Sequence, residues 1–206
     1  MKNNYNFIAP YYDFFARLVF GKSIQYSQLA FISKIPEGSK VLFIGGGSGN
    51  TLKNILQKKP QLQITYLEKS TKMLELSKKK VGKAKNITFT TQDLKEIPLG
   101  EFDVVLSFFF FDIFDLSTQE KLFKQVHEKL KPHGLWFISD FQPPKKEIHK
   151  GIEKLMFIFL KLTTSIASNC INDYQKPFNR FNYQKLCSKE FYGKFIFASL
   201  YKKAAL

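Results

Sequence analysis

The sequence predicts an α/β fold with a doubly wound, mostly parallel sheet that ends in an antiparallel hairpin. Across residues 40–140, short apolar runs alternate with longer stretches of helical periodicity, which is typical of βα units. A glycine-rich turn at residues 45–49 directly follows the first apolar run. Near the C-terminus, two strand-like segments meet at Gly193, which predicts the hairpin.

Five runs rich in β-branched and aromatic residues are expected to form the parallel strands. They are residues 40–44, 63–67, 86–91, 102–107 and 134–140. The stretches between them are expected to be helices. One follows the glycine turn and ends near Lys58. The others are residues 70–80 and an amphipathic helix at residues 117–130, which ends near Pro132.

The two ends of the chain differ from this central part. Residues 5–35 are rich in aromatic side chains and are predicted to be mainly helical. Residues 148–166 have apolar side chains at helical spacing, so one face of that helix is strongly apolar. Residues 185–202 form the predicted hairpin. We expect both ends to cover the carboxyl edge of the sheet, where open α/β sheets bind ligands.

The charge of the chain is strongly positive, with a formal net charge of +15. Arg17 and Arg180 are the only arginines among 32 basic residues, whereas nucleic-acid surfaces favour arginine. The composition therefore favours a solvated lysine surface over a nucleic-acid partner. Weak association with an anionic membrane or with acidic substrates stays open.

Cysteine and histidine positions predict neither a metal nor a redox site. Cys170 and Cys187 are isolated, and the three histidines are scattered. No signal peptide is recognisable at the N-terminus. The longest apolar run, residues 155–160, is far shorter than the roughly 20 residues that span a bilayer. We therefore expect a reduced, cytoplasmic protein without a metal.

The glycine turn comprises Gly45, Gly46, Gly47, Ser48 and Gly49. Glycine permits a tight turn and a close approach of a ligand to the backbone, and the helix that follows offers unpaired N–H groups to an anion. A dinucleotide-binding turn needs a further glycine three positions after Gly47, where this chain has Asn50. The spacing thus favours a different nucleotide-type cofactor over a nicotinamide dinucleotide.

Two carboxylates follow the next strands. Glu68, at the end of the second strand, can accept both ribose hydroxyls of an adenosine, or it can be a solvated charge. Asp93, after the third strand, can accept from an adenine amino group while Leu94 packs on the ring. Alternatively, Asp93 caps a turn or a helix.

These segments, in order, resemble the motifs of the class I S-adenosylmethionine-dependent methyltransferases. The runs are VLFIGGGSGN, ITYLEKSTKML, ITFTTQDL, FDVVLSFFFFDIF and LKPHGLWFISDF. The resemblance implies a Rossmann-like sheet of seven strands and S-adenosylmethionine as cofactor. It also implies a single methyltransferase domain with an N-terminal helical cap (residues 1–38), a cofactor-binding core (39–140), and a lid helix and hairpin (141–206).

The resemblance also implies roles for single residues. The glycine turn would hold the methionine part of the cofactor and Glu68 its ribose. The adenine would be surrounded by Lys69, Met73, Asp93 and Leu94. Ser107 and Phe108 would follow the fourth strand beside the methyl donor. The segment IAPYYDFFARLVFGK resembles the N-terminal segment of small-molecule and quinone-type members, in which Tyr12 and Asp13 match a Tyr-Asp pair before a helix over the cofactor.

Two positions depart from the family pattern. Phe43 stands where members usually have an acid that orients the turn and the methionine amino group, so either affinity is lower or another acid substitutes. Gly46 stands where many members have cysteine or another small residue, which we expect to be a mild change. Related aminopropyltransferases need acidic residues for a polyamine, which the charge of this chain does not favour.

The methyl acceptor is expected to be a small, apolar, aromatic or lipid-like molecule, because four phenylalanines occupy residues 108–111. Asp112 is the candidate general base for a hydroxyl or thiol acceptor. Equally, Asp112 or Asp115 caps the helix that begins near Ser117.

The Asn/Asp-Pro-Pro-aromatic motif of the amino methyltransferases of nucleic acids is absent after the fourth strand. An alternative is a catalytically silent protein that binds S-adenosylmethionine or S-adenosylhomocysteine as a partner or regulator. The oligomeric state stays open.

Overall fold

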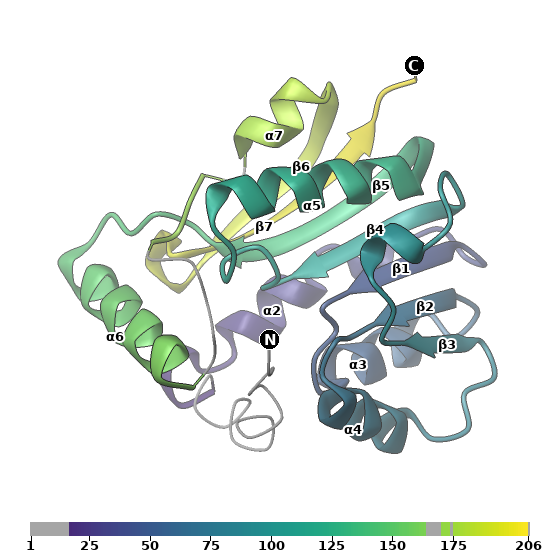
Figure 1. Cartoon of the computed structure of the whole chain (residues 1–206), viewed down its shortest axis with the longest axis horizontal. Helices are drawn as coiled ribbons and strands as arrows, with labels where there is room; N and C mark the ends of the chain where they lie inside the picture. Colours follow the sequence, from purple (N-terminus) through teal and green to yellow (C-terminus); the bar gives the residue numbers. More distant parts are fainter. Residues whose placement is uncertain (1–16, 164–169, 174, 206) are drawn as a thin grey trace.

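A single seven-stranded sheet forms the centre of the computed structural model, which describes residues 17–163, 170–173 and 175–205 (Figure 1). The strands lie in the order β3-β2-β1-β4-β5-β7-β6. Their bounds are β1 (Lys40–Ile44), β2 (Gln63–Leu67), β3 (Ile87–Thr90), β4 (Phe102–Phe108), β5 (Leu130–Phe141), β6 (Tyr183–Phe191) and β7 (Ile196–Lys203). The pairs among β1 to β5 are parallel, whereas β7 pairs antiparallel with both β5 and β6. The predicted fold class is confirmed.

Helices cover both faces of the sheet because the side chains of each strand alternate between two apolar clusters. Leu42 and Ile44 of β1 belong to the cluster under α5 (Leu116–Lys129) and α7 (Gln175–Arg180). Val41 and Phe43 belong to the cluster under α3 (Asn50–Lys58) and α4 (Thr71–Val81). Figure 1 shows α5 crossing in front of the sheet and α2 (Ser23–Leu29) behind it.

The predicted strands and helices of the central part agree closely with the structure, with one marked difference. β5 begins at Leu130, immediately after α5, rather than at residue 134. Its pairing with β4 shifts register between Leu130 and Leu135, and His133 has a φ of +62° in this irregular stretch. The segment LKPHG is therefore an irregular start of the strand, where the sequence predicted only the end of the preceding helix.

The predicted helical segments outside the core are described only in part. Within the described part of residues 5–35 there are one helical turn at residues 17–20, α2, and a 3-10 helix, Ile32–Lys34. α6 (Glu147–Thr163) runs to the last described residue of this range, and the predicted end at residue 166 lies outside the described residues. In the described ranges, no helix combines the length and apolar character needed to cross a bilayer.

Candidate active site

The ends of three parallel strands place the candidate site at one edge of the sheet. Ile44 lies in register with Leu67 of β2 and with Ser107 of β4. The segments that follow these strands therefore meet: the glycine turn after β1, Glu68 after β2, and the β4–α5 loop. This is the edge at which the sequence predicted the ligand.

The glycine turn needs glycine because of both backbone conformation and crowding. Gly45, Gly47 and Gly49 have φ values of +62°, +66° and +84°, in the left-handed region that side chains disfavour. A Cβ atom on Gly45 would lie 2.6 Å from the ring of Phe110, and one on Gly49 would lie 2.7 Å from Ser77. The turn is thus packed tightly between the β4–α5 loop and α4.

The peptide groups of Gly47 attach the turn to β2 and α4. The Gly47 N–H donates to Glu68 Oε2 at 2.9 Å. Its carbonyl accepts from the Tyr66 hydroxyl at 2.9 Å and from Ser77 Oγ at 2.8 Å. Because Ser77 Oγ also lies 2.9 Å from the Tyr66 hydroxyl, the three side chains form one network around a single residue.

An aromatic cluster fills the position of the family's acid. The ring of Phe43 is buried and packs edge-on against Tyr66 and Phe108, with centroids 5.2 and 5.5 Å apart. The sequence left open whether affinity is lower or another acid substitutes. In the structure, Glu68 accepts from the Gly47 N–H, and the hydroxyls of Tyr66 and Ser77 hold the Gly47 carbonyl.

The expectation that Gly46 is a mild change is wrong for this structure. A Cβ atom on Gly46 would fall within the ring of Tyr66. Any side chain at this position therefore forces Tyr66 to move and breaks its hydrogen bond to Gly47. Gly46 and Tyr66 are matched to each other, which a pattern of glycines alone does not reveal.

Glu68 is oriented by backbone donors. Its Oε1 accepts from Ser70 N–H at 2.8 Å, while its Oε2 accepts from Gly47. Burial raises the pKa of the Glu68 carboxyl, and the hydrogen bonds from Ser70 and Gly47 partly offset this rise. The carboxylate retains lone pairs for further donors, such as the hydroxyls of a ribose.

The residues expected around the adenine form two groups. Lys69 and Asp93 form an ion pair with side chains about half exposed, and Lys69 also donates to the carbonyl of Thr91 at 3.1 Å. Hydrogen bonding to Lys69 lowers the pKa of Asp93. Met73 of α4 and Leu94 are buried. Asp93 also stands at the N-cap of a 3-10 helix, Leu94–Glu96, so the capping alternative is realised as well.

Ser107 and Phe108 do not follow the fourth strand. β4 continues through Phe108, and both side chains are buried in the sheet. Ser107 Oγ accepts a hydrogen bond of 2.8 Å from the indole N–H of Trp136. The residues that leave the strand are Phe109, with a φ of +51°, and Phe110, whose ring packs beside Gly45. A direct role of Ser107 or Phe108 toward a cofactor stays a prediction.

A pair of buried carboxyl groups lies beneath this loop. Asp140, the penultimate residue of β5, is inaccessible to solvent and accepts from the N–H groups of Phe111 and Phe141 at 3.1 and 2.8 Å. Asp112 is also buried, and its Oδ1 has no hydrogen-bond partner among the described residues. The sequence did not single out Asp140, because a strand-end aspartate has no distinctive neighbours.

Burial and mutual repulsion keep these two groups from ionising together. Burial raises the pKa of Asp112 to about 7, and hydrogen bonds from the backbone of Asp112 and Ile113 lower it by less. Burial and then the charge of Asp112 raise the pKa of Asp140 well above its ordinary value. The pair therefore holds one proton near neutral pH.

Asp112 is not the helix cap. Asp115 Oδ1 accepts from Thr118 N–H at 2.8 Å and caps α5, which begins at Leu116. Gln119 of α5 donates to the carbonyls of Phe111 and Phe114 at 2.9 and 2.8 Å. The loop that bears Asp112 is thus fixed from both β5 and α5.

The described residues fit a nucleotide-type cofactor. Gly47 has a left-handed φ, yet a Cβ atom there would meet no atom within 4 Å, so the space beside it can admit a ligand. Ser48 is buried and accepts from Lys80 Nζ at 3.0 Å at the start of α3. Tyr12 and Asp13 lie outside the described residues, and their predicted role stays a prediction. In the described ranges, no group of His, Cys, Asp and Glu side chains could hold a metal ion.

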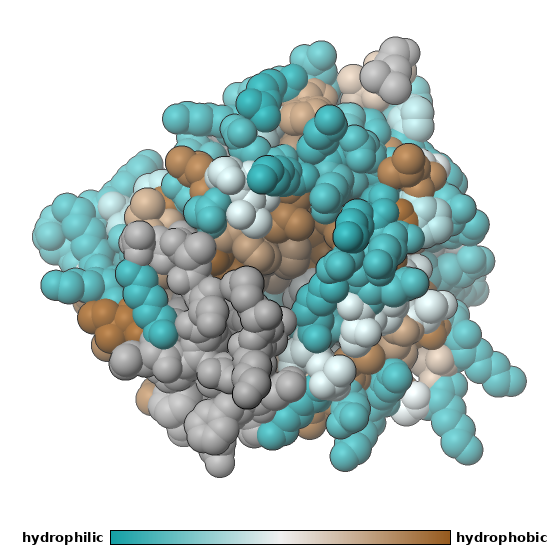
Figure 2. Space-filling model, in the orientation of Figure 1, coloured by the Kyte–Doolittle hydropathy of each residue, from teal (hydrophilic) through white to brown (hydrophobic). Residues whose placement is uncertain are grey.

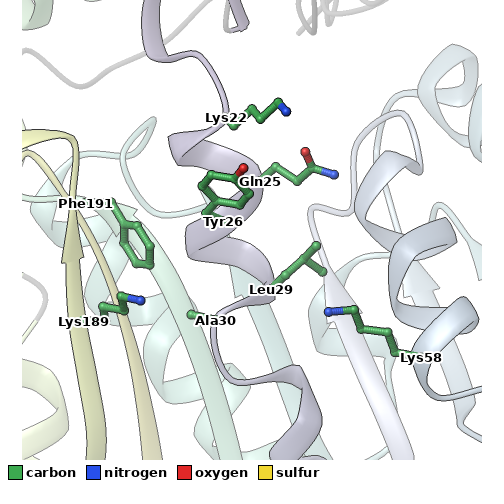
Figure 3. A pocket seen from close by; sticks show the side chains of 8 residues that line it. All are labelled: Lys22, Gln25, Tyr26, Leu29, Ala30, Lys58, Lys189 and Phe191. Carbon is green, nitrogen blue, oxygen red and sulfur yellow. The ribbon is translucent and has the colours of Figure 1, made fainter.

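Figure 2 shows an apolar, hollowed surface in the region of the β4–α5 loop, bordered by hydrophilic side chains. A separate cavity of about 430 Å³ opens beside the C-terminal end of α3 (Figure 3). Its lining consists of Lys22, Gln25, Tyr26, Leu29, Ala30, Lys58, Lys189 and Phe191. The cavity includes no residue of the glycine turn, so it is distinct from the candidate site.

Comparisons with known proteins indicate the family of the chain. A family model described as a methyltransferase domain matches residues 41–134. The ubiquinone/menaquinone biosynthesis C-methyltransferase of Geotalea uraniireducens is 30% identical over 168 residues, which are 78% of this chain and 70% of that protein. The malonyl-acyl-carrier-protein O-methyltransferase 2 of Ilyobacter polytropus is 31% identical over 54% of this chain and 42% of its own length. The chain thus spans less than half of the second relative.

A solved structure supports the fold. The 1,6-didemethyltoxoflavin-N1-methyltransferase of Burkholderia thailandensis, solved with 1,6-didemethyltoxoflavin and S-adenosylhomocysteine, superposes with a TM-score of 0.69. The alignment covers 98% of this chain and 87% of that chain at 12% identity. At this identity, the likeness concerns the fold alone.

The matched packing of Gly46 and Tyr66 leads to a first prediction. We expect Gly46→Ala to lower the free energy of unfolding by about 2 kcal/mol, because overpacking displaces Tyr66 and its hydrogen bond. Urea denaturation measures this change. Gly151→Ala on α6 is the control, since a Cβ there meets nothing within 4 Å. Equal stability of Gly46→Ala and the wild type would contradict the packing described.

Proposed function

This chain belongs to the class I S-adenosylmethionine-dependent methyltransferases, and we propose that it transfers a methyl group to a small, apolar or aromatic acceptor. The observation that supports the cofactor most strongly is the link between the glycine turn and Glu68 through Gly47 N–H. This hydrogen bond holds the buried carboxylate of Glu68 next to Gly47, where a Cβ atom would meet no other atom within 4 Å. A second carboxylate, Asp93, lies at the neighbouring strand end in an ion pair with Lys69.

The main task of the site residues in this proposal is to bind and orient the cofactor. The turn and the first N–H groups of α3 would hold the methionine carboxylate, and Glu68 would hold the ribose hydroxyls. Met73 and Leu94 would provide apolar contacts for the adenine, with Lys69 and Asp93 near its polar edge. When bound, S-adenosylmethionine supplies an electrophilic methyl group on a positively charged sulfur. Alignment and exclusion of water are then the main tasks of the protein.

We assign the general base to Asp112. Its unpartnered Oδ1 is an acceptor for a proton, and its pKa of about 7 suits a base at neutral pH. Asp140 acts as a positioning residue, since it accepts from Phe111 N–H and so holds the loop that bears Asp112. An acceptor hydroxyl or acidic carbon that reaches Asp112 would lose its proton to this pair.

Apolar side chains near the site favour an apolar or aromatic acceptor. The rings of Phe110 and Phe114 pack edge-on with centroids 5.4 Å apart, and both are partly exposed. The Geotalea uraniireducens relative is named for ubiquinone and menaquinone biosynthesis. A quinone-like ring is therefore the acceptor class that we propose to test first.

Calorimetric titration tests the cofactor. We expect S-adenosylmethionine and S-adenosylhomocysteine to bind, and NAD not to bind. We expect Glu68→Gln to weaken S-adenosylhomocysteine binding by about tenfold to a hundredfold, because hydrogen bonds to a charged acceptor contribute roughly 1.5–3 kcal/mol. Glu75→Gln, on the exposed surface of α4, is the control and should leave affinity unchanged.

Each other outcome has a clear meaning. Absence of binding to both sulfur compounds would refute the proposed function. Tighter binding of NAD would indicate an oxidoreductase. Binding without turnover across a panel of hydroxyl, amine and quinone acceptors would indicate the catalytically silent alternative.

The carboxyl pair predicts a pH dependence. Because the base must be deprotonated, we expect kcat/KM to rise with pH through about 7 and then level off. Asp112→Asn should reduce turnover by roughly a hundredfold or more while S-adenosylhomocysteine affinity stays nearly unchanged. Asp140→Asn should leave this inflection near 7, because burial sets the pKa of Asp112 and Asp140 keeps its own proton in this range.

Asp115→Asn is the matched control for these variants. Asparagine keeps an oxygen that can accept from Thr118 N–H at the N-cap of α5, so we expect both the stability and the pH profile to stay nearly unchanged. An inflection well below 7 in Asp140→Asn would show instead that the charge of Asp140, and not burial, raises the pKa of Asp112.

A further inference from the structure

The outward face of α6 combines apolar and basic side chains. His149 and Phe157 are buried and mark the inward face of the helix. The ring of His149 stacks on Phe195, with centroids 5.0 Å apart. With this orientation, Ile148, Leu155 and Ile158 point outward and are 69%, 65% and 47% exposed. At 3.6 residues per turn these three positions form one stripe along the helix.

A second stripe, on the flank of the helix between buried Phe157 and the apolar stripe, is basic. Lys150, Lys154 and Lys161 are exposed and lie side by side along the helix. The two acids of the helix are engaged: Glu147 pairs with Lys150 at 2.7 Å, and Glu153 accepts from Ile171 N–H at 2.9 Å. Figure 2 shows hydrophobic side chains over α6 with hydrophilic ones beside them.

We propose that α6 docks the protein on an anionic lipid bilayer, with the apolar stripe in the headgroup region and the lysines against the lipid charges. A helix with adjacent apolar and basic stripes has the form of an interfacial helix. The net charge of +15 has the sign that an anionic surface attracts. The helix is about 25 Å long and is held to the protein by its inward face, so it would lie in the plane of the membrane.

A second copy of this chain is a poorer occupant of the same surface. A two-fold symmetric contact through α6 would bring its lysine stripe against the lysine stripe of the partner, and like charges in contact are unfavourable. An anionic lipid surface is therefore the better match for the lysine stripe of α6, whereas a dimer contact would have to neutralise its charge.

Vesicle co-sedimentation tests the proposal on the full chain and does not depend on methyl transfer. We expect binding to vesicles in which roughly a third of the lipid is phosphatidylglycerol, weakened by added salt, and little binding to pure phosphatidylcholine. The combined variant Lys150→Gln, Lys154→Gln and Lys161→Gln should bind about a hundredfold more weakly, since each lysine contributes roughly fivefold.

The matched control removes the same charge elsewhere. Lys83→Gln, Lys85→Gln and Lys124→Gln alter three exposed lysines outside α6 and should retain most of the binding. The double variant Leu155→Gln and Ile158→Gln keeps every charge, and we expect it to lose about tenfold or more, because the apolar stripe no longer inserts. Circular dichroism checks that each variant is folded.

Three outcomes would overturn the proposal. One is equal loss of binding in the two lysine variants, which would indicate general charge attraction. Another is unchanged binding of the Leu155→Gln, Ile158→Gln variant. The third is a wild-type dimer in light scattering that becomes monomeric in this variant, which would identify α6 as a contact between copies. Failure of S-adenosylhomocysteine binding bears only on the proposed function, because vesicle binding is measured without cofactor.

Discussion

Three hydrogen bonds at Gly47 determine the shape of the candidate site. They connect the turn that follows β1 with β2 and with α4. The Gly47 N–H donates to Glu68, and the Gly47 carbonyl accepts from the hydroxyls of Tyr66 and Ser77. A turn of consecutive glycines has high conformational freedom, so without these partners it would not hold one arrangement for a ligand. The same bonds orient the Glu68 carboxylate, which links the preorganisation of the turn to that of the ribose site.

This network explains how the chain tolerates Phe43. An acid at that position would have to be satisfied by polar partners in the interior, whereas Phe43 packs among Tyr66 and Phe108. The tyrosine then provides the hydrogen bond that attaches the turn, and its ring occupies the space above Gly46. Loss of one charge and gain of one aromatic cluster are therefore parts of the same change. Asp112 and Asp140 concentrate the acidity of the site on the other side of the turn, beneath Phe110 and Phe111.

The strands and the glycine turn were predictable because their signals are local. KVLFI is a short apolar run that ends at a turn, as a buried strand does, and the turn has glycine at Gly45, Gly47 and Gly49, where φ is positive. The side-chain partners were not predictable in the same way. Tyr66, Ser77 and Asp140 act through contacts with residues far along the chain, and each looks ordinary among its neighbours. Asp112 and Asp115 are three residues apart and look alike in the sequence. Only burial and hydrogen bonds in the structure distinguish Asp112, whose Oδ1 has no partner among the described residues, from Asp115, which caps the helix.

β7 lies inside the sheet, between β5 and β6, although it is the last of the seven strands in the chain. During synthesis, β5 and β6 therefore leave the ribosome before the strand that joins them. Until Ile196–Lys203 emerges, the edge of β5 that later pairs with β7 has no partner strand. β6, which pairs with β7 in the described sheet, has no partner strand either. Nascent chains at this stage present an apolar, unpaired strand edge to solvent, which is the kind of surface that chaperones bind and that aggregates recruit.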